Sequence, residues 1–216
     1  EDVTEMMTLK VGEITVDAPI SVDGKRICRL GECLMGNLVT DAMLWQVNTV
    51  GGGDYQIAVT NGGGLRAALL AGDVTYGGVM TVLPFGNTIA TMELKGEDLL
   101  AALEHSARSY PSENGGFLQV SGMRYTFDPA QADGSRIVSA EVWNGTAYEA
   151  VLADTVYKVV TNNFTRNGGD GYTWFRDNAI NPYDFGPALH EAVIDYFWDF
   201  SPVTPEIEGR INIVEP

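Results

Sequence analysis

Three glycine-rich loops, at residues 61–66, 83–87 and 163–171, constrain this 216-residue chain more than any other feature of its sequence. The first loop follows a segment, 55–60, that has the composition of a short strand, and the third follows another strand candidate at 156–161. Glycine allows tight bends and close backbone approach, so such loops either close a surface turn or surround a ligand. The sequence therefore predicts strands that end in loops where binding residues can gather.

The first loop imitates a dinucleotide-binding fingerprint without its context. Its glycines are Gly62, Gly63 and Gly64. The fingerprint needs a crossover helix and an acidic residue at the end of the next strand, about 20 residues on. Here the expected helix at 67–72 is short, and the matching window at 85–87 holds no acid. Two interpretations stay open: a turn without a ligand, or a backbone that approaches a ligand, with Asn61 and Arg66 as polar contacts.

The other two loops carry a carboxylate and two aromatic rings. Asp170 follows Gly168 and Gly169, a pattern common in surface turns, although a carboxylate there can also accept hydrogen bonds from paired hydroxyls. Phe85 lies between a proline and a glycine, and Phe164 opens the third loop. Such phenylalanines commonly belong to a core. Two of them on glycine-rich loops beside an arginine also suggest a flat ring stacked between them.

Strands and helices alternate irregularly along the chain. Strand composition is found at residues 11–22, 55–60, 88–94, 117–120, 123–127, 137–142, 156–161 and 210–214. Helical spacing is found at 36–46, 97–108 and 188–200, with Pro187 at the first position of the last helix. This mixture predicts the α+β class, a single domain at 11–214 with a mixed sheet packed with helices, after a polar lead-in at 1–10. Because the chain opens without a methionine or a signal-type segment, we expect a fragment or a processed product.

The charge balance restricts the partners of the chain. Thirteen Lys and Arg residues against 29 Asp and Glu residues give a formal net charge of −16. Such a charge repels nucleic acid and anionic membranes, although a small anion responds only to the local field of a pocket. No apolar stretch is long enough for a membrane span. With two histidines and no repeated Cys-x-x-Cys, the sequence predicts no catalytic metal centre in this chain.

Two further pairs of residues have a plain interpretation beside a functional one. Cys28 and Cys33 enclose four residues, and spacing alone leaves a short disulfide and two free thiols equally open. We expect His105 to be a capped or core histidine rather than a base, and Glu104 to be a solvated acid.

Four segments in this order and spacing make the chain resemble the C-terminal, substrate-binding domain of the 5′-nucleotidases. They are 28–42, 61–66, 83–87 and 163–171, supported by shorter stretches at 94–96, 104–106, 117–122 and 208–211. The likeness runs from about Val11 to Ile213. Each motif alone is weak, and the specificity lies in all four together.

The resemblance implies a nucleoside site on the three loops. Phe85 and Phe164 would hold the base between them, and Asp170 would accept hydrogen bonds from the ribose hydroxyls. The glycines of the loops would allow close approach: Gly62, Gly63, Gly64, Gly168 and Gly169.

Polar residues would complete that site. Arg29 and Arg66 would face the ribose-phosphate, and Asn61 would hydrogen-bond near the base or the sugar. Guanidinium groups suit phosphate oxygens, and two positioned arginines would let a −16 domain bind an anion.

The resemblance further implies a two-domain hydrolase. Its N-terminal metallophosphoesterase domain would hold two divalent metal ions and the catalytic residues, so this chain would supply none and would be inactive alone. Motifs of the type Asp-x-His and Gly-Asn-His-Asp/Glu are absent from the sequence. The expected partners are a nucleotide or nucleoside and the N-terminal domain of the same polypeptide, and relatives also form homodimers.

Other assignments stay open within and beyond this resemblance. UDP-sugar hydrolases and 2′,3′-cyclic nucleotide phosphodiesterases would share the base-binding residues. A non-catalytic module that binds surface ligands is the alternative from another class. The resemblance favours an oxidised Cys28–Cys33 pair. The acidic composition and the lack of a second cysteine pair favour a bacterial protein that is secreted, at the cell surface or in the periplasm.

Overall fold

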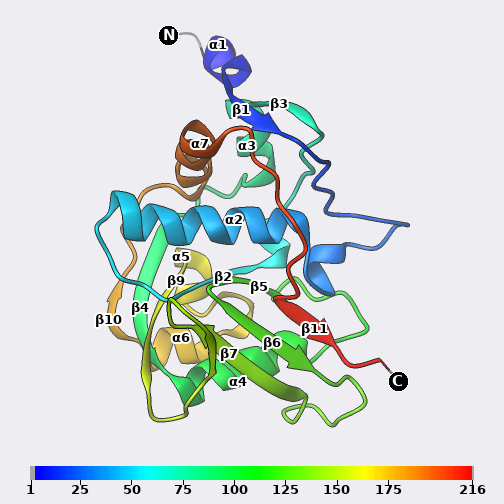
Figure 1. The fold of residues 1–216 in the computed structure, drawn as a ribbon, viewed down its shortest axis with the longest axis vertical. Helices are drawn as coiled ribbons and strands as arrows, with labels where there is room; N and C mark the ends of the chain where they lie inside the picture. Colours follow the sequence, from blue (N-terminus) through cyan, green and yellow to red (C-terminus); the bar gives the residue numbers. More distant parts are fainter. Residues whose placement is uncertain (1–2, 216) are drawn as a thin grey trace.

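A five-stranded mixed sheet lies at the centre of the molecule in the computed structural model, which describes residues 3–215 (Figure 1). Its strand order is β10-β4-β9-β2-β5. The bounds of these strands are Ile57–Asn61 for β2, Ile89–Lys95 for β4, Leu118–Ser121 for β5, Val156–Asn162 for β9 and Ile180–Tyr183 for β10. Strand β9 pairs parallel with β2 and antiparallel with β4, which confirms the predicted α+β fold with a mixed sheet.

Two further sheets flank the central one. The larger has the order β11-β6-β7-β8, in which β11 runs parallel to β6. Its strands span Met123–Phe127 (β6), Ile137–Trp143 (β7), Tyr148–Ala150 (β8) and Ile211–Ile213 (β11). The smaller pairs β1 (Lys10–Ile14) with β3 (Gly72–Thr75) antiparallel.

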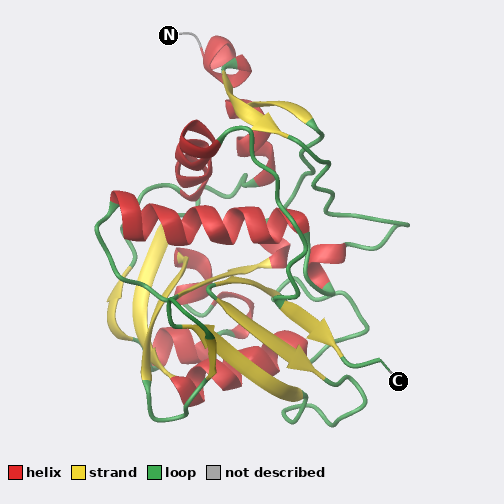
Figure 2. Cartoon of the chain, in the orientation of Figure 1, coloured by secondary structure: helices red, strands yellow, loops and turns green. Residues whose placement is uncertain are grey.

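Helices lie on both sides of the central sheet (Figure 2). Above it in this view are α2 (Leu34–Trp45), α3 (Tyr76–Val82) and α7 (Leu189–Phe200), with α1 (Val3–Thr8) at the top. Below it are α4 (Gly96–Ala107) and α6 (Thr173–Asp177), while α5 (Asn163–Arg166) follows β9 directly. The sheet is thus a middle layer between two helical layers.

Alternation of side chains along the central strands creates two cores. Every residue of β2 is buried, with Ile57 and Val59 in the core beside α4, and Ala58 in the core beside α2. Strand β9 divides in the same way between Val159 and Val160. Because successive strand residues point to opposite faces, the first three residues of β2, which are covered on both faces, are all apolar.

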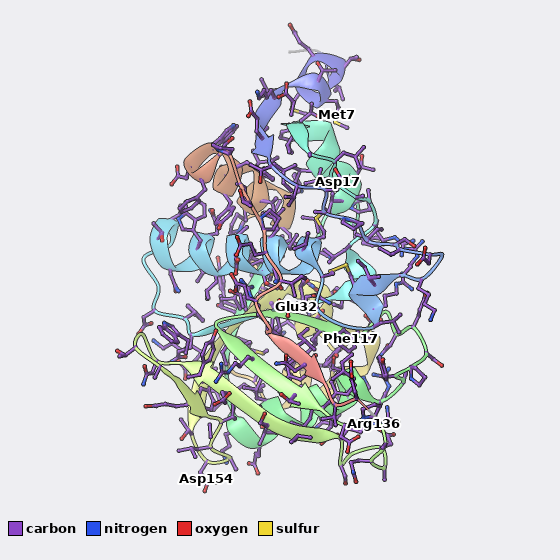
Figure 3. All side chains as sticks on the ribbon, turned by 45° about the vertical axis from the view of Figure 1, so that its right-hand side comes forward. Met7, Asp17, Glu32, Phe117, Arg136 and Asp154 are labelled. Atoms are coloured by element: carbon purple, nitrogen blue, oxygen red, sulfur yellow. A yellow bond between two sulfur atoms is a disulfide. The ribbon has the colours of Figure 1, made fainter. Side chains whose placement is uncertain are left out.

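Glu32 joins the C-terminal segment to the body of the molecule. Its carboxylate accepts hydrogen bonds from the backbone N–H groups of Glu208 and Arg210, both at 2.8 Å, and from the Asn37 amide at 2.7 Å. Figure 3 shows Glu32 between α2 and the chain that leads into β11. Arg210 in turn donates from both terminal nitrogens to Asp41 at 2.8 Å.

The sequence misplaced several local elements. No helix forms at 67–72; instead Leu69 bridges Ala18 in an extended segment, and the helix begins later, at Tyr76. The strand expected over 11–22 ends at Ile14, and the lead-in contains α1, although residues 1 and 2 lie outside the described part. Pro187 precedes the N-cap residue Ala188 rather than occupying the first turn of α7.

Gly36 of α2 lies directly against the buried side chain of Gln119 on β5. A Cβ atom at Gly36 would come within 2.2 Å of the Gln119 Oε1. Gln119 cannot move without cost, because it accepts from the Cys33 N–H at 3.1 Å and donates to the carbonyls of Cys28 and Gly31 at 3.0 and 2.7 Å.

We therefore expect Gly36→Ala to lower the free energy of unfolding by about 1–3 kcal/mol, the usual cost of overpacking a core. Urea unfolding followed by circular dichroism measures this loss. Gly31→Ala is the matched control, because a Cβ there would meet only the Ile213 Cδ1 at 3.7 Å. Equal stability of the two variants would contradict the close helix–strand contact.

Candidate functional site

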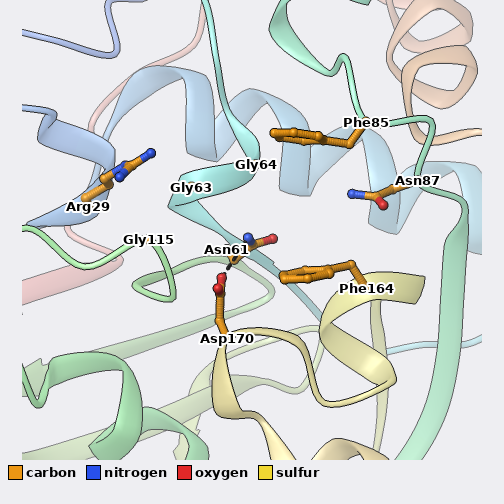
Figure 4. Close-up of a pocket in the computed structure, with 9 residues that line it drawn as sticks. All are labelled: Arg29, Asn61, Gly63, Gly64, Phe85, Asn87, Gly115, Phe164 and Asp170. Atoms are coloured by element: carbon orange, nitrogen blue, oxygen red, sulfur yellow. Dashed lines mark hydrogen bonds between the residues drawn. The ribbon is translucent and has the colours of Figure 1, made fainter.

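An open cavity of about 360 Å³ lies where the loops after β2 and β9 meet the loop before β4. Strands β2 and β9 run parallel, so their carboxyl ends reach the same edge of the sheet, a common place for ligands. Figure 4 shows the lining residues: Arg29, Asn61, Gly63, Gly64, Phe85, Asn87, Gly115, Phe164 and Asp170.

Phe85 and Phe164 face each other across the cavity, with a gap between their rings (Figure 4). Their exposed fractions are 60% and 44%, so neither ring belongs to a core. Aromatic faces with open space between them can stack on both sides of a flat ring. Of the two interpretations left open by the sequence, the structure therefore favours the pair of stacking surfaces.

Asp170 is held at the cavity from two sides. Its backbone has a left-handed conformation with φ of 55°, and its Oδ2 accepts a hydrogen bond from the Asn61 Nδ2 at 3.0 Å. The Nε2 of His105 lies 2.8 Å from the Asp170 carbonyl oxygen, which can only accept, so this nitrogen carries a proton. Among the hydrogen bonds of the described residues, none involves Oδ1 of Asp170, which is available to a ligand.

Asn61 links the two strand ends beneath the cavity. Its Oδ1 accepts hydrogen bonds from the Asn162 Nδ2 at 3.0 Å and the Thr165 hydroxyl at 3.3 Å. The side chain is therefore fixed from β9 and α5, while its Nδ2 reaches Asp170. This arrangement makes Asn61 a support for Asp170, and a second N–H on the same nitrogen remains for a ligand.

Arg29 reaches the cavity from a short helical turn, Ile27–Arg29, next to a disulfide. Cys28 and Cys33 are bonded, with Cα atoms 5.2 Å apart. Gly62 packs against this turn so closely that a Cβ atom would lie 1.9 Å from the Cys28 carbonyl oxygen. The glycine thus allows the turn that carries Arg29 to lie beside the end of β2.

Arg29 brings a positive charge to the edge of the cavity, which Asp170 also lines, although the chain as a whole is acidic. Burial lowers the pKa of Arg29, and the charges of Arg26 and Arg66 lower it further. A guanidinium nevertheless stays protonated. Within residues 3–215, neither Arg29 nor Arg66 has a carboxylate partner, and the Arg29 Nε is buried without a hydrogen bond. An anion could satisfy this unpaired charge.

Most of the residues predicted from the sequence come together here, and some take supporting positions. Arg66 does not line the cavity; its guanidinium lies 5.8 Å from the centre of the Phe85 ring. Gly169 approaches Phe164, since a Cβ atom would come within 2.6 Å of the ring, and Gly168 has a φ of 92°. Gly62 supports the turn at Cys28.

Asn87 and Gly115 line the cavity without having been predicted. Asn87 belongs to the second glycine-rich loop, and its place beside Phe85 was a usable signal. Gly115 belongs to the pair Gly115-Gly116, which resembles the other loops but follows no predicted strand. Its carbonyl accepts the Gly63 N–H at 2.8 Å, a contact between distant segments.

Glu104 is not the solvated acid that the sequence suggested. Its two carboxylate oxygens accept hydrogen bonds at 2.8 Å from the backbone N–H groups of Arg136 and Ile137. The neighbouring His105 packs edge-on against Tyr172 and Trp174. Both residues of α4 thus hold other segments in place.

A second cavity, of about 480 Å³, lies beside the C-terminal end of α2. Its lining is mainly apolar, and it contains none of the site residues predicted from the sequence. No group of three or more His, Cys, Asp and Glu residues in the described part is placed to hold a metal ion. The helices of residues 3–215 include none with the length and apolar character needed to cross a membrane.

Known proteins are similar to this chain in sequence and in fold. Residues 10–177 match the family described as "5′-nucleotidase, C-terminal domain". A 5′-nucleotidase from Diplobatis ommata is 37% identical over 201 residues, which cover 87% of this chain and 34% of that protein. An apyrase from Tabanus yao is 34% identical over 223 residues, which cover 98% of this chain and 40% of the apyrase.

A solved structure gives the same result. The crystal structure of a 5′-nucleotidase precursor from Thermus thermophilus matches with a TM-score of 0.91 and 40% identity, over 99% of this chain and 41% of the other. The chain thus spans 34–41% of the length of these three proteins.

Burial of His105 predicts a pH dependence of stability. Burial lowers the pKa of His105 from its ordinary value of 6.5, despite the opposing hydrogen bond to Asp170. The unfolded chain therefore binds a proton at a higher pH than the folded chain does, so the free energy of unfolding falls as the pH drops from about 7.5 to about 5.5.

His105→Gln retains an N–H donor and does not titrate, so we expect it to lose less stability over this range than the original chain. Urea unfolding of both proteins at the two pH values measures the difference, and the shared carboxylates cancel in the comparison. The same loss in both proteins would show that His105 makes no contribution.

Proposed function

The chain belongs to the family of 5′-nucleotidase C-terminal domains, and from that premise we propose that it is the nucleoside-binding domain of a metal-dependent 5′-nucleotidase. The observation that carries this proposal is the pair of exposed rings, Phe85 and Phe164, that face each other across a cavity edged by Asp170 and Arg29. A scaffold domain would have no use for two solvent-exposed rings beside an unpaired guanidinium.

Each part of a nucleotide finds a chemical counterpart in the cavity. The base stacks between Phe85 and Phe164, where its two faces lose contact with water. The ribose hydroxyls donate to Asp170, whose Oδ2 is already bonded to Asn61 and whose Oδ1 is open. The phosphate lies towards Arg29, because charge-assisted hydrogen bonds stabilise phosphate oxygens there.

Arg66 acts on the site through Phe85. Its guanidinium lies 5.8 Å from the centre of that ring, and a cation at this distance is attracted by the π electrons. This contact steadies the loop that carries Phe85 and adds positive charge near the phosphate. In this proposal Asn61 positions Asp170 and offers its second N–H to the base or the sugar.

We assign the hydrolytic chemistry to an N-terminal metallophosphoesterase domain of the same polypeptide. There, two divalent metal ions would activate water and stabilise the leaving oxygen. The present domain then binds nucleotides without hydrolysing them when it is alone. The proposal is supported by the relatives, which extend well beyond the 34–41% of their length that this chain covers.

The finer assignments follow the same reasoning. A disulfide persists in oxidising compartments, so the Cys28–Cys33 bond supports an exported protein, outside the cell or in the periplasm. A bacterial source fits the acidic composition.

Substrate domains of UDP-sugar hydrolases or 2′,3′-cyclic nucleotide phosphodiesterases would use the same base-binding rings. A surface module without an enzyme partner would bind nucleosides equally well, and an upstream phosphoesterase domain in the gene distinguishes it. A homodimer is a further expectation, tested by the mass in solution.

Removal of either ring should weaken nucleoside binding. We expect Phe85→Ala and Phe164→Ala each to raise the Kd for adenosine about 5- to 150-fold, which corresponds to about 1–3 kcal/mol of stacking. Titration calorimetry on the 216-residue chain measures this change. Phe200→Ala is the control, because Phe200 is 46% exposed, similar to the 44% of Phe164, but packs against Trp45 instead. Unchanged affinity in both cavity variants would refute the stacked base.

The assignment of Asp170 can be tested with the ligand as its own control. Asp170→Asn should raise the Kd for adenosine about 10-fold or more, the usual effect of losing a charged hydrogen-bond acceptor. For 2′,3′-dideoxyadenosine, which lacks both hydroxyls, the same variant should leave Kd unchanged. Calorimetry with both ligands gives the comparison. An equal loss for the two ligands would mean that Asp170 does not recognise the ribose.

A further inference from the structure

The two rings of the cavity are carried by separate loops, and one short segment forms hydrogen bonds with both of them. This segment, residues 183–189, runs from the end of β10 into α7. Its backbone is bonded to the start of β4: the Gly186 N–H donates to the Ile89 carbonyl at 3.0 Å, and the Leu189 N–H donates to the Asn87 carbonyl at 2.8 Å. The segment therefore lies along the loop that carries Phe85.

Asp184, within this segment, also forms hydrogen bonds with α5, the helix that carries Phe164. Its two carboxylate oxygens accept hydrogen bonds from the Nε and Nη2 of Arg166, at 2.6 and 2.7 Å. Arg166 is the last residue of α5, two positions after Phe164, and it also donates to the carbonyl of Phe175 at 3.3 Å. Such a two-point contact fixes direction as well as distance.

The backbone of Asp184 holds the opposite loop. Its carbonyl oxygen accepts a hydrogen bond from the Thr88 hydroxyl at 2.7 Å. Thr88 in turn forms two bonds with Asn163, N–H to Oδ1 at 3.1 Å and carbonyl to N–H at 3.0 Å. One residue thus contacts Thr88, three positions after Phe85, and Arg166, two positions after Phe164.

The ion pair is shielded from solvent. The side chains of Arg166 and Asp184 are 10% and 23% exposed. The hydrogen bonds from Arg166 hold the pKa of Asp184 below its ordinary value, and the carboxylate therefore stays charged at neutral pH. Removing one member of such a pair leaves the other charge without its partner.

We propose that Asp184 is a positioning residue that fixes the two phenylalanine rings relative to each other and so sets the gap that admits a flat base. The role rests on the proposed nucleoside site, which it deepens. Asp184 does not line the cavity, so it acts through the loops and not on the ligand. The β4–β9 pairing and the Thr88–Asn163 bonds bring the two loops together, and Asp184 adds a cross-connection from Thr88 to Arg166 that holds their rings face to face.

A double-mutant cycle separates this role from general stabilisation. We expect Asp184→Asn to raise the Kd for adenosine about 3- to 10-fold, and to change it less than about 2-fold when Phe164 is already alanine, because the ring through which it acts is then gone. Asp177→Asn is the matched control: Asp177 accepts the same two-point contact from Arg176, at 2.7 and 2.8 Å, on an exposed surface. An equal loss in both backgrounds would overturn the proposal.

A second measurement does not depend on the ligand. In chains labelled with fluorophenylalanine, the ¹⁹F resonances of Phe85 and Phe164 should shift or broaden in Asp184→Asn and stay in place in Asp177→Asn. Unmoved resonances would refute the positioning role even if nucleosides bind. Moved resonances in a chain that binds no adenosine would uphold it while the nucleoside site itself fails. If Asp184→Asn does not fold, Arg166→Lys, which keeps the charge and loses the two-point contact, replaces it in both experiments.

Discussion

The parallel pairing of β2 with β9 is the contact on which the site depends. It brings Asn61 and Asn162, the last residues of the two strands, to one edge of the sheet, where the Nδ2 of Asn162 donates to the Oδ1 of Asn61 at 3.0 Å. Every residue of β2 and the last four residues of β9 are buried, so two cores hold this edge at once. The loop that carries both Phe164 and Asp170 starts from that fixed point, and its direction follows from it.

Close backbone contacts place the remaining side of the cavity. The turn with Arg29 reaches the sheet only because Gly62 has no Cβ atom to meet the Cys28 carbonyl, and the N–H of Gly63 bonds to the Gly115 carbonyl. A disulfide at Cys28 restricts the same turn. The cavity edge is therefore shaped by backbone and covalent contacts, which leave the Arg29 guanidinium unpaired and free for an anion. A local cation in a chain of net charge −16 is electrostatically possible because screening confines the opposing charges to short range.

Sequence patterns predicted the helices and strands that depend on residues close to one another in the chain. The strand at 123–127 coincides with β6, and the helix at 97–108 lies within one residue of α4, since both have clear periodicity. Strand β10 was missed because its four residues are exposed and include a proline, which gives no alternation to detect. The helix expected at 67–72 is wrong, because the pairing of Leu69 with Ala18 holds that segment extended. Local propensity cannot anticipate a partner about 50 residues away.

The same distinction explains which parts of the candidate site were visible in the sequence. Phe85, Phe164 and Asp170 lie on loops whose glycines indicate an unusual backbone conformation. Each loop could therefore be recognised in the sequence by itself. In our proposal the gap between the rings depends on Asp184, which belongs to no motif of its own and whose partners Thr88 and Arg166 come from two other segments. Residues whose own side chains would contact a ligand can thus be predicted from a sequence. Residues that position the binding side chains can be identified only once the fold shows their partners. Their role lies in contacts between segments and not in the sequence of any one segment.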